Sequence, residues 1–179
     1  MTDKHLKDHS VPASRYVAAL RQCGVGHVVT VPDWVQLALH ARLEAGEDGL
    51  ALINTCNENQ AVTVAAGLTL GGQRPVLVMQ NQGFYNCVNT LRAVCLDARI
   101  PLVLMVGQFG REFDNLGQPA TASRRTMVRL MEPLLDTLGI AFHRLDATAD
   151  LPCIEKAYAQ AADTGNAVVV LVSAPLAWS

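Results

Sequence analysis

Short apolar runs alternate with longer stretches of helical periodicity along the whole chain. Six runs rich in β-branched and aliphatic residues predict strands at 27–31, 50–54, 76–80, 102–106, 141–145 and 167–172. The intervening stretches predict helices at 11–23, 33–45, 57–70, 83–98, 123–138 and 150–163. Glycines follow most of these helical stretches, as is common at helix C-termini.

The character of the strands indicates how the elements assemble. The second, third, fourth and sixth runs show little polar alternation, which is typical of parallel strands buried on both faces. We therefore predict an α/β fold, a doubly wound and mostly parallel six-stranded sheet with helices on both faces. At 179 residues, positions 1–179 are expected to form a single domain. The polar residues 1–10 are expected to be a flexible N-terminal tail or a lead-in to the first helix.

Charge and cysteine content argue against several partners. The net charge is −2, with acidic and basic residues mixed, so no nucleic-acid or membrane partner is expected. None of the five cysteines belongs to a Cys-x-x-Cys pair or lies at metal-ligand spacing from a histidine, so no metal site is expected. Without a signal-like or membrane-spanning apolar run, we expect a cytoplasmic protein with reduced thiols. Only 17% of residues are charged, which suggests a surface partly covered by another subunit.

Polar side chains gather where the first four predicted strands end. The carboxyl ends of parallel strands meet at one edge of the sheet, where open α/β folds bind ligands. The side chains at these ends, in chain order, are Asp33, Glu58, Gln80, Asn81, Gln82, Gln108 and Arg111. Glu58 is the first candidate for chemistry, because it opens a helix built from small residues. Neither a glycine-rich nucleotide cradle nor a G-x-S-x-G elbow follows any of these strands.

Each candidate also has a purely structural interpretation. The helix dipole and free N–H groups favour an acid such as Glu58 in a first helical turn. Asp33 could cap the helix that follows Pro32. The amides at 80–82 could satisfy backbone groups of a turn, although three amides at a buried strand end exceed what a turn requires. The basic residues of the long irregular segment 107–123 and its border could be solvated surface groups.

Three segments in order resemble the thiamine diphosphate enzymes, specifically their pyrimidine-binding (PYR) domain. Residues 57–67, with Glu58 heading an Ala/Gly-rich helix, match the arrangement after the second strand of that family. Residues 79–83, Met-Gln-Asn-Gln-Gly, are similar to the Met-Gln-Asn-Ser-Gly segment of sulfopyruvate and phosphonopyruvate decarboxylase subunits. Val31-Pro32-Asp33 is similar to a Val-Pro-Asp or Val-Pro-Cys turn of the same group. The resemblance extends over nearly the whole chain.

The resemblance implies roles for individual residues. It implies that Glu58 is catalytic and hydrogen-bonds N1′ of the aminopyrimidine of the cofactor, which makes the exocyclic amine a base for the C2 proton. Asp33 is the second candidate catalytic residue. The candidate contacts are Gln80, Asn81 and Gln82 for the cofactor, and Gln108, Arg111, Phe84 and Tyr85 for the substrate. Arg111 would serve a sulfonate or phosphonate group, whereas the bulky Phe84 and Tyr85 would reshape the pocket.

The second half of the family's cofactor site is not recognisable in this chain. The Gly-Asp-Gly motif that holds Mg²⁺ and the diphosphate does not occur, and the nearest sequence, Glu47-Asp48-Gly49, precedes a strand. The resemblance therefore implies a diphosphate-binding (PP-domain) beta subunit that holds Mg²⁺. Thiamine diphosphate would be shared between the two chains in a hetero-oligomer that also self-associates.

The expected function is that of the PYR-type (alpha) subunit of a thiamine diphosphate-dependent 2-oxo acid decarboxylase. It would resemble sulfopyruvate or phosphonopyruvate decarboxylase, with the particular small 2-oxo acid left open. Two alternatives remain: a subunit of an acetolactate synthase-like carboligase, and a non-catalytic α/β subunit with a structural or regulatory role.

Overall fold

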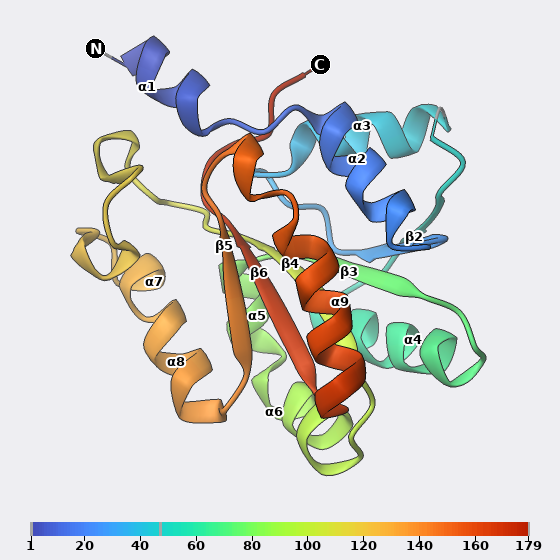
Figure 1. The fold of residues 1–179 in the computed structure, drawn as a ribbon. Coiled ribbons are helices and arrows are strands. Elements are labelled where there is room, and N and C mark those ends of the chain that lie inside the picture. The colour runs from blue at the N-terminus through green and yellow to red at the C-terminus, as the bar shows by residue number, and fades with distance from the viewer. Residues whose placement is uncertain (1, 47, 179) are drawn as a thin grey trace.

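The six predicted strands are all present, each within one residue of its predicted ends. The computed structural model describes residues 2–46 and 48–178. The strands are β1 (His27–Thr30), β2 (Ala51–Asn54), β3 (Pro75–Gln80), β4 (Leu102–Gly107), β5 (Ala141–Leu145) and β6 (Ala167–Val172). They form one parallel sheet in the order β2-β1-β3-β4-β6-β5 (Figure 1). The first four strands are therefore neighbours, and their carboxyl ends share one edge.

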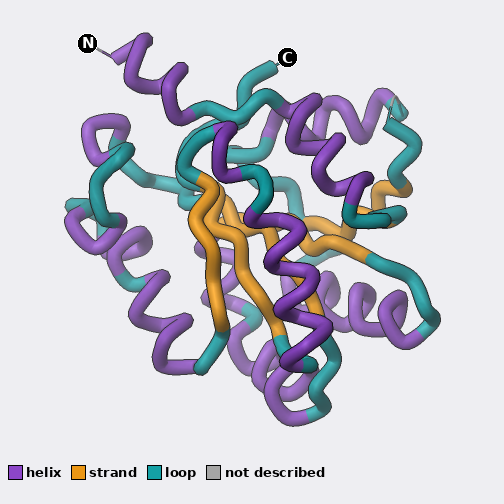
Figure 2. The backbone as a smooth tube through the Cα atoms, viewed as in Figure 1, coloured by secondary structure: helices purple, strands orange, loops and turns teal. Residues whose placement is uncertain are grey.

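Helices cover both faces of the sheet, which confirms the doubly wound architecture (Figures 1 and 2). One face carries α2 (Ala13–Gln22), α3 (Leu37–Ala45) and α9 (Cys153–Thr164), and the other carries α4 (Glu58–Leu70), α5 (Asn81–Asn86), α6 (Val88–Leu91) and α8 (Met131–Leu138). Successive strand residues point to opposite faces. Val28 accordingly packs in one core cluster and Val29 in the other, and both are fully buried.

Two of the predicted helices are interrupted. The stretch predicted at 83–98 divides into α5, α6 and a π-helical turn, Arg92–Asp97. The α5 helix ends at Asn86, because the backbone torsion angles of the next residue, Cys87, leave the helical region. The stretch predicted at 123–138 divides into α7 (Thr126–Arg129) and α8. Pro133 explains this second break, because it has no N–H to donate to the carbonyl of Arg129.

Strand β2 is more exposed than expected. Its apolar sequence suggested a strand buried on both faces, but β2 lies at the edge of the sheet and pairs only with β1. Ala51 and Asn54 are exposed, and the two residues between them are half-buried. An apolar composition does not distinguish an edge strand from a central one, so the sequence left its position undetermined.

Residues 2–10, for which we expected a flexible tail or a lead-in to the first helix, contain helix α1 (Thr2–His9). Two side-chain contacts connect the end of this segment to the domain. Nδ1 of His9 lies 3.0 Å from the carbonyl oxygen of Asp146, and Oγ of Ser10 donates to the carbonyl of Pro175 at 2.5 Å. Both partners are distant in sequence, so the local polar pattern could not indicate them.

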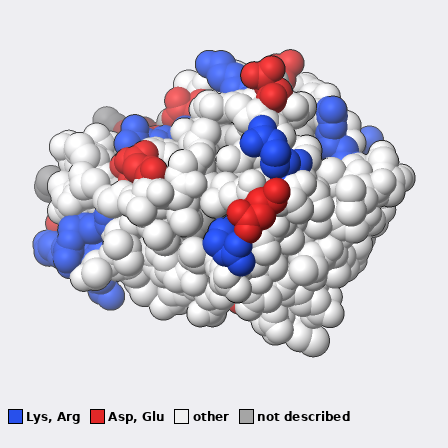
Figure 3. Space-filling view, turned by 90° about the horizontal axis from the view of Figure 1, so that it is seen from below, with Lys and Arg blue, Asp and Glu red and all other residues white. Residues whose placement is uncertain are grey.

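Charged residues form no single-sign surface on the face drawn in Figure 3. Lys and Arg alternate there with Asp and Glu, and broad uncharged areas separate them.

None of the described helices is long and apolar enough to cross a membrane. The cytoplasmic location stays a prediction.

Candidate active site

Glu58 is the first residue of helix α4, directly after β2. Asn57 caps this helix, because its side-chain oxygen accepts a hydrogen bond of 3.0 Å from the backbone N–H of Gln60. In return, Oε1 of Gln60 accepts from the backbone N–H of Cys56 at 2.8 Å. The first turn of α4 is therefore stabilised without Glu58. Within the described residues, the half-buried Glu58 carboxylate makes no hydrogen bond or ion pair.

The Glu58 side chain packs against Gly83, in the helix that follows β3. A Cβ atom added to Gly83 would lie 2.4 Å from Oε1 and 2.6 Å from Cγ of Glu58. Both distances are far inside van der Waals contact, so only glycine allows the carboxylate to lie here. Burial, and then the nearby Glu58 charge, raise the pKa of Cys87 to about 12. Two segments that carried the sequence resemblance, 57–67 and 79–83, thus meet in space.

Asp33 is buried at the end of β4 rather than open to the sheet edge. Its side chain is 1% exposed and accepts hydrogen bonds from the N–H groups of Val35 and Gly107 and from Nε2 of Gln36. A Cβ atom on Gly107 would lie 2.0 Å from Oδ2 of Asp33. Helix α3 begins at Leu37, so Asp33 is not the helix N-cap. These contacts favour a positioning role, with the carboxylate joining the segment after β1 to the end of β4.

The buried network around Asp33 extends into the core. Oε1 of Gln36 accepts from the hydroxyl of Tyr16 at 2.5 Å, and its Nε2 also donates to the carbonyl of Met105 at 3.1 Å. Burial, followed by the Asp33 charge, raises the pKa of Tyr16. Nε2 of His40 accepts from the backbone N–H of Asp33 at 3.0 Å, and burial lowers the pKa of His40. His40 is therefore neutral in this arrangement.

Asp33 should make the stability of the fold depend on pH. Burial raises its pKa to about 6, although hydrogen bonds from Gln36, Val35 and Gly107 oppose this rise. Because an exposed aspartate titrates near ~3.9, Asp33 contributes stability that is fully present below about pH 4 and is lost as pH rises through about 6. The quantity to compare is the difference in the free energy of unfolding between wild type and Asp33→Asn. We expect this difference to fall by about 2–3 kcal/mol between about pH 4 and about pH 7. Urea denaturation checks this, and a difference independent of pH would contradict it.

The three amides after β3 have different environments. Asn81 is fully buried, and its Nδ2 donates to the carbonyls of Phe109 at 3.0 Å and Met127 at 3.2 Å. It therefore fastens the long segment after β4 to the start of α5, and its predicted cofactor contact has no structural support. Nε2 of Gln80 donates to Oε1 of Gln82 at 2.8 Å, and this pair lies at the surface. Gln80 and Gln82 remain available for contact with a ligand.

The guanidinium of Arg111 binds residues of the long segment and of the end of β6, whereas we expected it to bind the substrate. The Arg111 side chain is 3% exposed, and its guanidinium lies 3.5 Å from the carboxylate of Asp146. The five guanidinium N–H groups each have an acceptor: Gln108 Oε1 (2.7 Å), Ser173 Oγ (2.7 Å), Asn115 Oδ1 (3.0 Å), Asn115 O (3.4 Å) and Gln118 O (2.7 Å). No donor is left for a substrate, and Gln108 is occupied by the same network. The predicted substrate contacts of both residues therefore lack structural support.

Phe84 also differs from its predicted role. Helix α5 begins at Asn81, two residues earlier than predicted, and this start directs Phe84 into the core. Phe84 is fully buried among apolar residues of the sheet and α4. The hydroxyl of the half-buried Tyr85 donates to the carbonyl of Met127 at 2.5 Å, and burial raises the pKa of Tyr85 to about 12. Phe84 therefore packs in the core beneath α5, and Tyr85 connects α5 to the segment that contains Met127.

Two aromatic residues at the same edge were missed by sequence reasoning. Trp34 follows Asp33 and is 56% exposed, and Phe109 follows the end of β4. Their rings lie edge to face, with centroids 6.1 Å apart and an interplanar angle of 75°. The sequence did contain one indication of this pair, because the large aromatic residue Trp34 directly follows the candidate acid Asp33.

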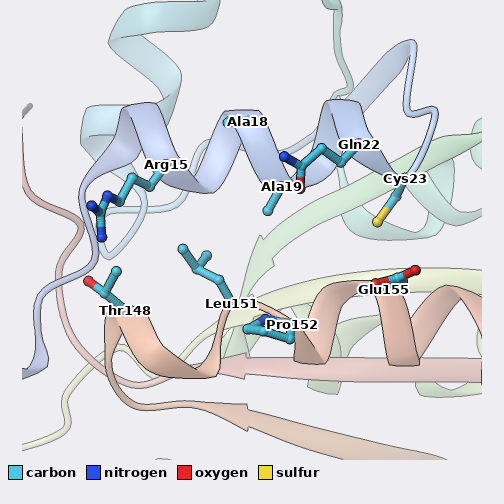
Figure 4. A pocket seen from close by; sticks show the side chains of 9 residues that line it. All are labelled: Arg15, Ala18, Ala19, Gln22, Cys23, Thr148, Leu151, Pro152 and Glu155. Carbon is cyan, nitrogen blue, oxygen red and sulfur yellow. The ribbon is translucent and has the colours of Figure 1, made fainter.

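A cleft of about 520 Å³ lies away from these residues, between α2 and the start of α9 (Figure 4). Arg15 and Gln22 border it from α2, whereas Leu151 and Glu155 border it from the opposite side. It contains none of the candidate site residues. Among the described residues, no group of three or more His, Cys, Asp or Glu side chains is placed to hold a metal ion.

Comparisons with known proteins identify a family and several relatives. The family profile described as "Thiamine pyrophosphate enzyme, N-terminal TPP binding domain" matches residues 13–127. Sulfopyruvate decarboxylase of Methanosarcina acetivorans is 22% identical over 168 residues, covering 93% of this chain and 41% of that protein. Phosphonopyruvate decarboxylase of Streptomyces viridochromogenes is 29% identical over 140 residues, covering 78% and 34%. The chain thus spans about two fifths and one third of the lengths of these relatives.

A shorter relative and a solved structure complete the comparison. Sulfopyruvate decarboxylase subunit alpha of Methanothermobacter thermautotrophicus is 26% identical over 117 residues, covering 64% of this chain and 70% of that subunit. The thiamine diphosphate-dependent 4-hydroxybenzoylformate decarboxylase of Rhodococcus jostii superposes with a TM-score of 0.65. That match has 19% identity and covers 92% of this chain and 30% of the other. It establishes the similarity of the folds.

Proposed function

The chain belongs to the family of N-terminal TPP-binding domains of thiamine pyrophosphate enzymes, and from this we propose that it is the PYR-type (alpha) subunit of a 2-oxo acid decarboxylase. The names of its relatives, which include sulfopyruvate and phosphonopyruvate decarboxylases, support decarboxylation as the reaction class. Relatives named as alpha subunits support a division of the enzyme into separate chains.

The observation that carries this proposal is the Glu58 carboxylate beside Gly83. Its helix is capped by other residues, and the carboxylate has no hydrogen-bond or ion-pair partner within the described part of the chain. It lies at the carboxyl edge of the sheet, where open α/β folds bind ligands. A carboxylate held in place but without a partner can accept a hydrogen bond from a protonated ring nitrogen.

The residues at this edge fit the pyrimidine end of the cofactor. When bound, thiamine diphosphate would supply a nucleophilic thiazolium carbon for the 2-oxo group and a ring that serves as the electron sink for decarboxylation. Glu58 would hold a proton at N1′ of the pyrimidine, and the accessible amides of Gln80 and Gln82 could contact the ring. Gly83 leaves room for the Glu58 side chain, and Asp33 joins the segment after β1 to the end of β4. Mg²⁺ and the diphosphate would be held by a partner chain.

An uncovered surface beside Glu58 supports the proposed partner. Glu58 lies between the half-exposed edge strand β2 and the outer face of α4. The exposed residues of that face are the polar Asn59, Gln60 and Thr63 together with Gly67 and Leu70, and Leu70 is 75% exposed. A partner covering it would remove apolar surface from water and close the Glu58 site. We place the diphosphate-binding beta subunit here, in a hetero-oligomer.

Thiamine diphosphate binding in the presence and absence of the partner tests the proposal. The chain alone, a Gly-Asp-Gly-containing candidate partner alone and their mixture would each be titrated with thiamine diphosphate and Mg²⁺ by calorimetry. We expect thiamine diphosphate to bind only in the mixture. We also expect only the mixture to release carbon dioxide from a 2-oxo acid. Tight binding by this chain alone would contradict a shared site. Adding an acceptor aldehyde to the mixture then separates decarboxylation from carboligation.

A further inference from the structure

The rings of Trp34 and Phe109 form an aromatic pair at the sheet edge, and the backbone on either side holds them in place. Asp33, directly before Trp34, binds the N–H of Gly107, and Phe109 lies two residues after Gly107. The N–H of Phe109 also donates to the carbonyl of Gly107 at 2.9 Å. The ends of β1 and β4 are thereby joined, which brings the two rings into edge-to-face contact. Trp34 nevertheless keeps more than half of its surface exposed.

The aromatic pair is connected to Glu58 through the start of α5. The carbonyl of Phe109 accepts from Nδ2 of Asn81, the first residue of α5. Two residues further along, Gly83 contacts the Glu58 side chain. Trp34 and Phe109 therefore border the end of β3 on one side, and Glu58 borders it on the other. A substrate that reacts beside Glu58 would have to extend across the end of β3 to contact the aromatic pair.

Most arginine side chains near this edge already bind other groups of the protein. A sulfonate or phosphonate group calls for guanidinium or ammonium donors. Arg111 has none left, and Arg124 lies 3.3 Å from the carboxylate of Asp114 and 3.6 Å from that of Glu112. Arg129 donates to Ser123 and Thr126. Arg125 is the one arginine of this segment whose guanidinium has no partner within the described residues.

We propose that Trp34 and Phe109 bind the side chain of the substrate, and that this substrate is an apolar or aromatic 2-oxo acid. The inference rests on the proposed function, since it concerns the substrate of the same site. An exposed tryptophan face with an aromatic neighbour offers stacking and apolar contact but no charge. It therefore favours a phenyl or branched aliphatic group over a sulfonate.

The test is a substrate panel with the reconstituted two-chain enzyme. We would measure kcat/KM for phenylpyruvate, pyruvate and sulfopyruvate with wild type, Trp34→Ala and Phe109→Leu. Phenylpyruvate is expected to be the best of the three in wild type. Trp34→Ala should lower kcat/KM for phenylpyruvate about 10- to 100-fold more than for pyruvate, as expected when an apolar subsite is lost. Phe109→Leu should act in the same direction with a smaller effect.

The matched control is the second tryptophan of the chain. Trp178 is 72% exposed and borders α3 near Ala45, away from the end of β3. Trp178→Ala should leave the relative kcat/KM values of the three substrates unchanged. Equal losses for all substrates with Trp34→Ala, together with weaker assembly in sedimentation, would assign Trp34 to the subunit interface and overturn the proposal.

A preference for sulfopyruvate that disappears in Arg125→Gln would also overturn the apolar subsite. In that case the decarboxylase function would stand, because the enzyme would still be turning over a 2-oxo acid. A cofactor-loaded complex that decarboxylates none of the three acids would instead contradict the proposed function, and the subsite with it.

Discussion

Replacing Glu58 with glutamine is expected to lower kcat of the assembled enzyme by about 10²- to 10⁴-fold, the range for loss of a group that controls proton transfer. Glutamine keeps the shape of the side chain, but a neutral amide does not stabilise a proton at N1′ of the pyrimidine. The substitution removes no hydrogen bond within the described structure, because the carboxylate has no partner there. The free energy of unfolding should therefore change by less than about 0.5 kcal/mol. Steady-state kinetics and urea denaturation of the same preparation give both values.

Glu155 provides the matched control for this substitution. It is also an acid in the first turn of a helix and is exposed, but it borders the cleft between α2 and α9. Glu155→Gln should leave kcat unchanged. Full turnover by Glu58→Gln would show that catalysis does not depend on this carboxylate, and would favour a non-catalytic role for the chain.

Gly83→Ala should impair catalysis without unfolding the protein. The added Cβ would meet the end of the Glu58 side chain at 2.4 Å, and a flexible side chain can rotate away from such a contact. A displacement of about 1 Å at a catalytic group can cost about 10²-fold in rate, so we expect kcat to fall by roughly that factor. Alanine is a better helix former than glycine by about 0.5–1 kcal/mol, which offsets part of the steric cost to stability. Kinetics with the assembled enzyme and denaturation of the chain alone separate the two effects.

A double-variant experiment identifies Glu58 as the residue through which Gly83 acts. In the Glu58→Gln background, adding Gly83→Ala should cost little further activity, because the positioned group is already lost. Gly26→Ala is the control substitution, since its added Cβ would have nothing within 4 Å and should not change kcat. An equal loss from Gly83→Ala in both backgrounds would mean that Gly83 acts independently of Glu58.

The sheet and the place of the candidate site could be predicted because they depend on local patterns. Buried parallel strands have continuous apolar sequences, so all six were located, and Glu58 was recognised because it follows one of them directly. The edge position of β2 was not predictable from the same signal. The order of the strands depends on which helices cover each face of the sheet, and the sequence of a single segment does not reveal this.

The roles of several individual residues could not be predicted, because their partners are distant in sequence. Arg111 looked like a free donor for substrate, but its acceptors include Ser173 and Gln118, which only the folded chain brings to it. Phe84 was predicted to line the substrate pocket, but α5 begins at Asn81 and Phe84 is buried in the core. The contact between Gly83 and Glu58 joins two strand ends and has no counterpart in any local pattern.

The central claim is that Glu58 activates the cofactor in a site shared with a second chain. The most direct test is the rate at which the C2 proton of bound thiamine diphosphate exchanges with deuterium in the assembled enzyme, measured by rapid-quench NMR. We expect exchange in Glu58→Gln to be slower than in wild type by at least about 10²-fold. Equal exchange rates in the two assembled enzymes would contradict the claim.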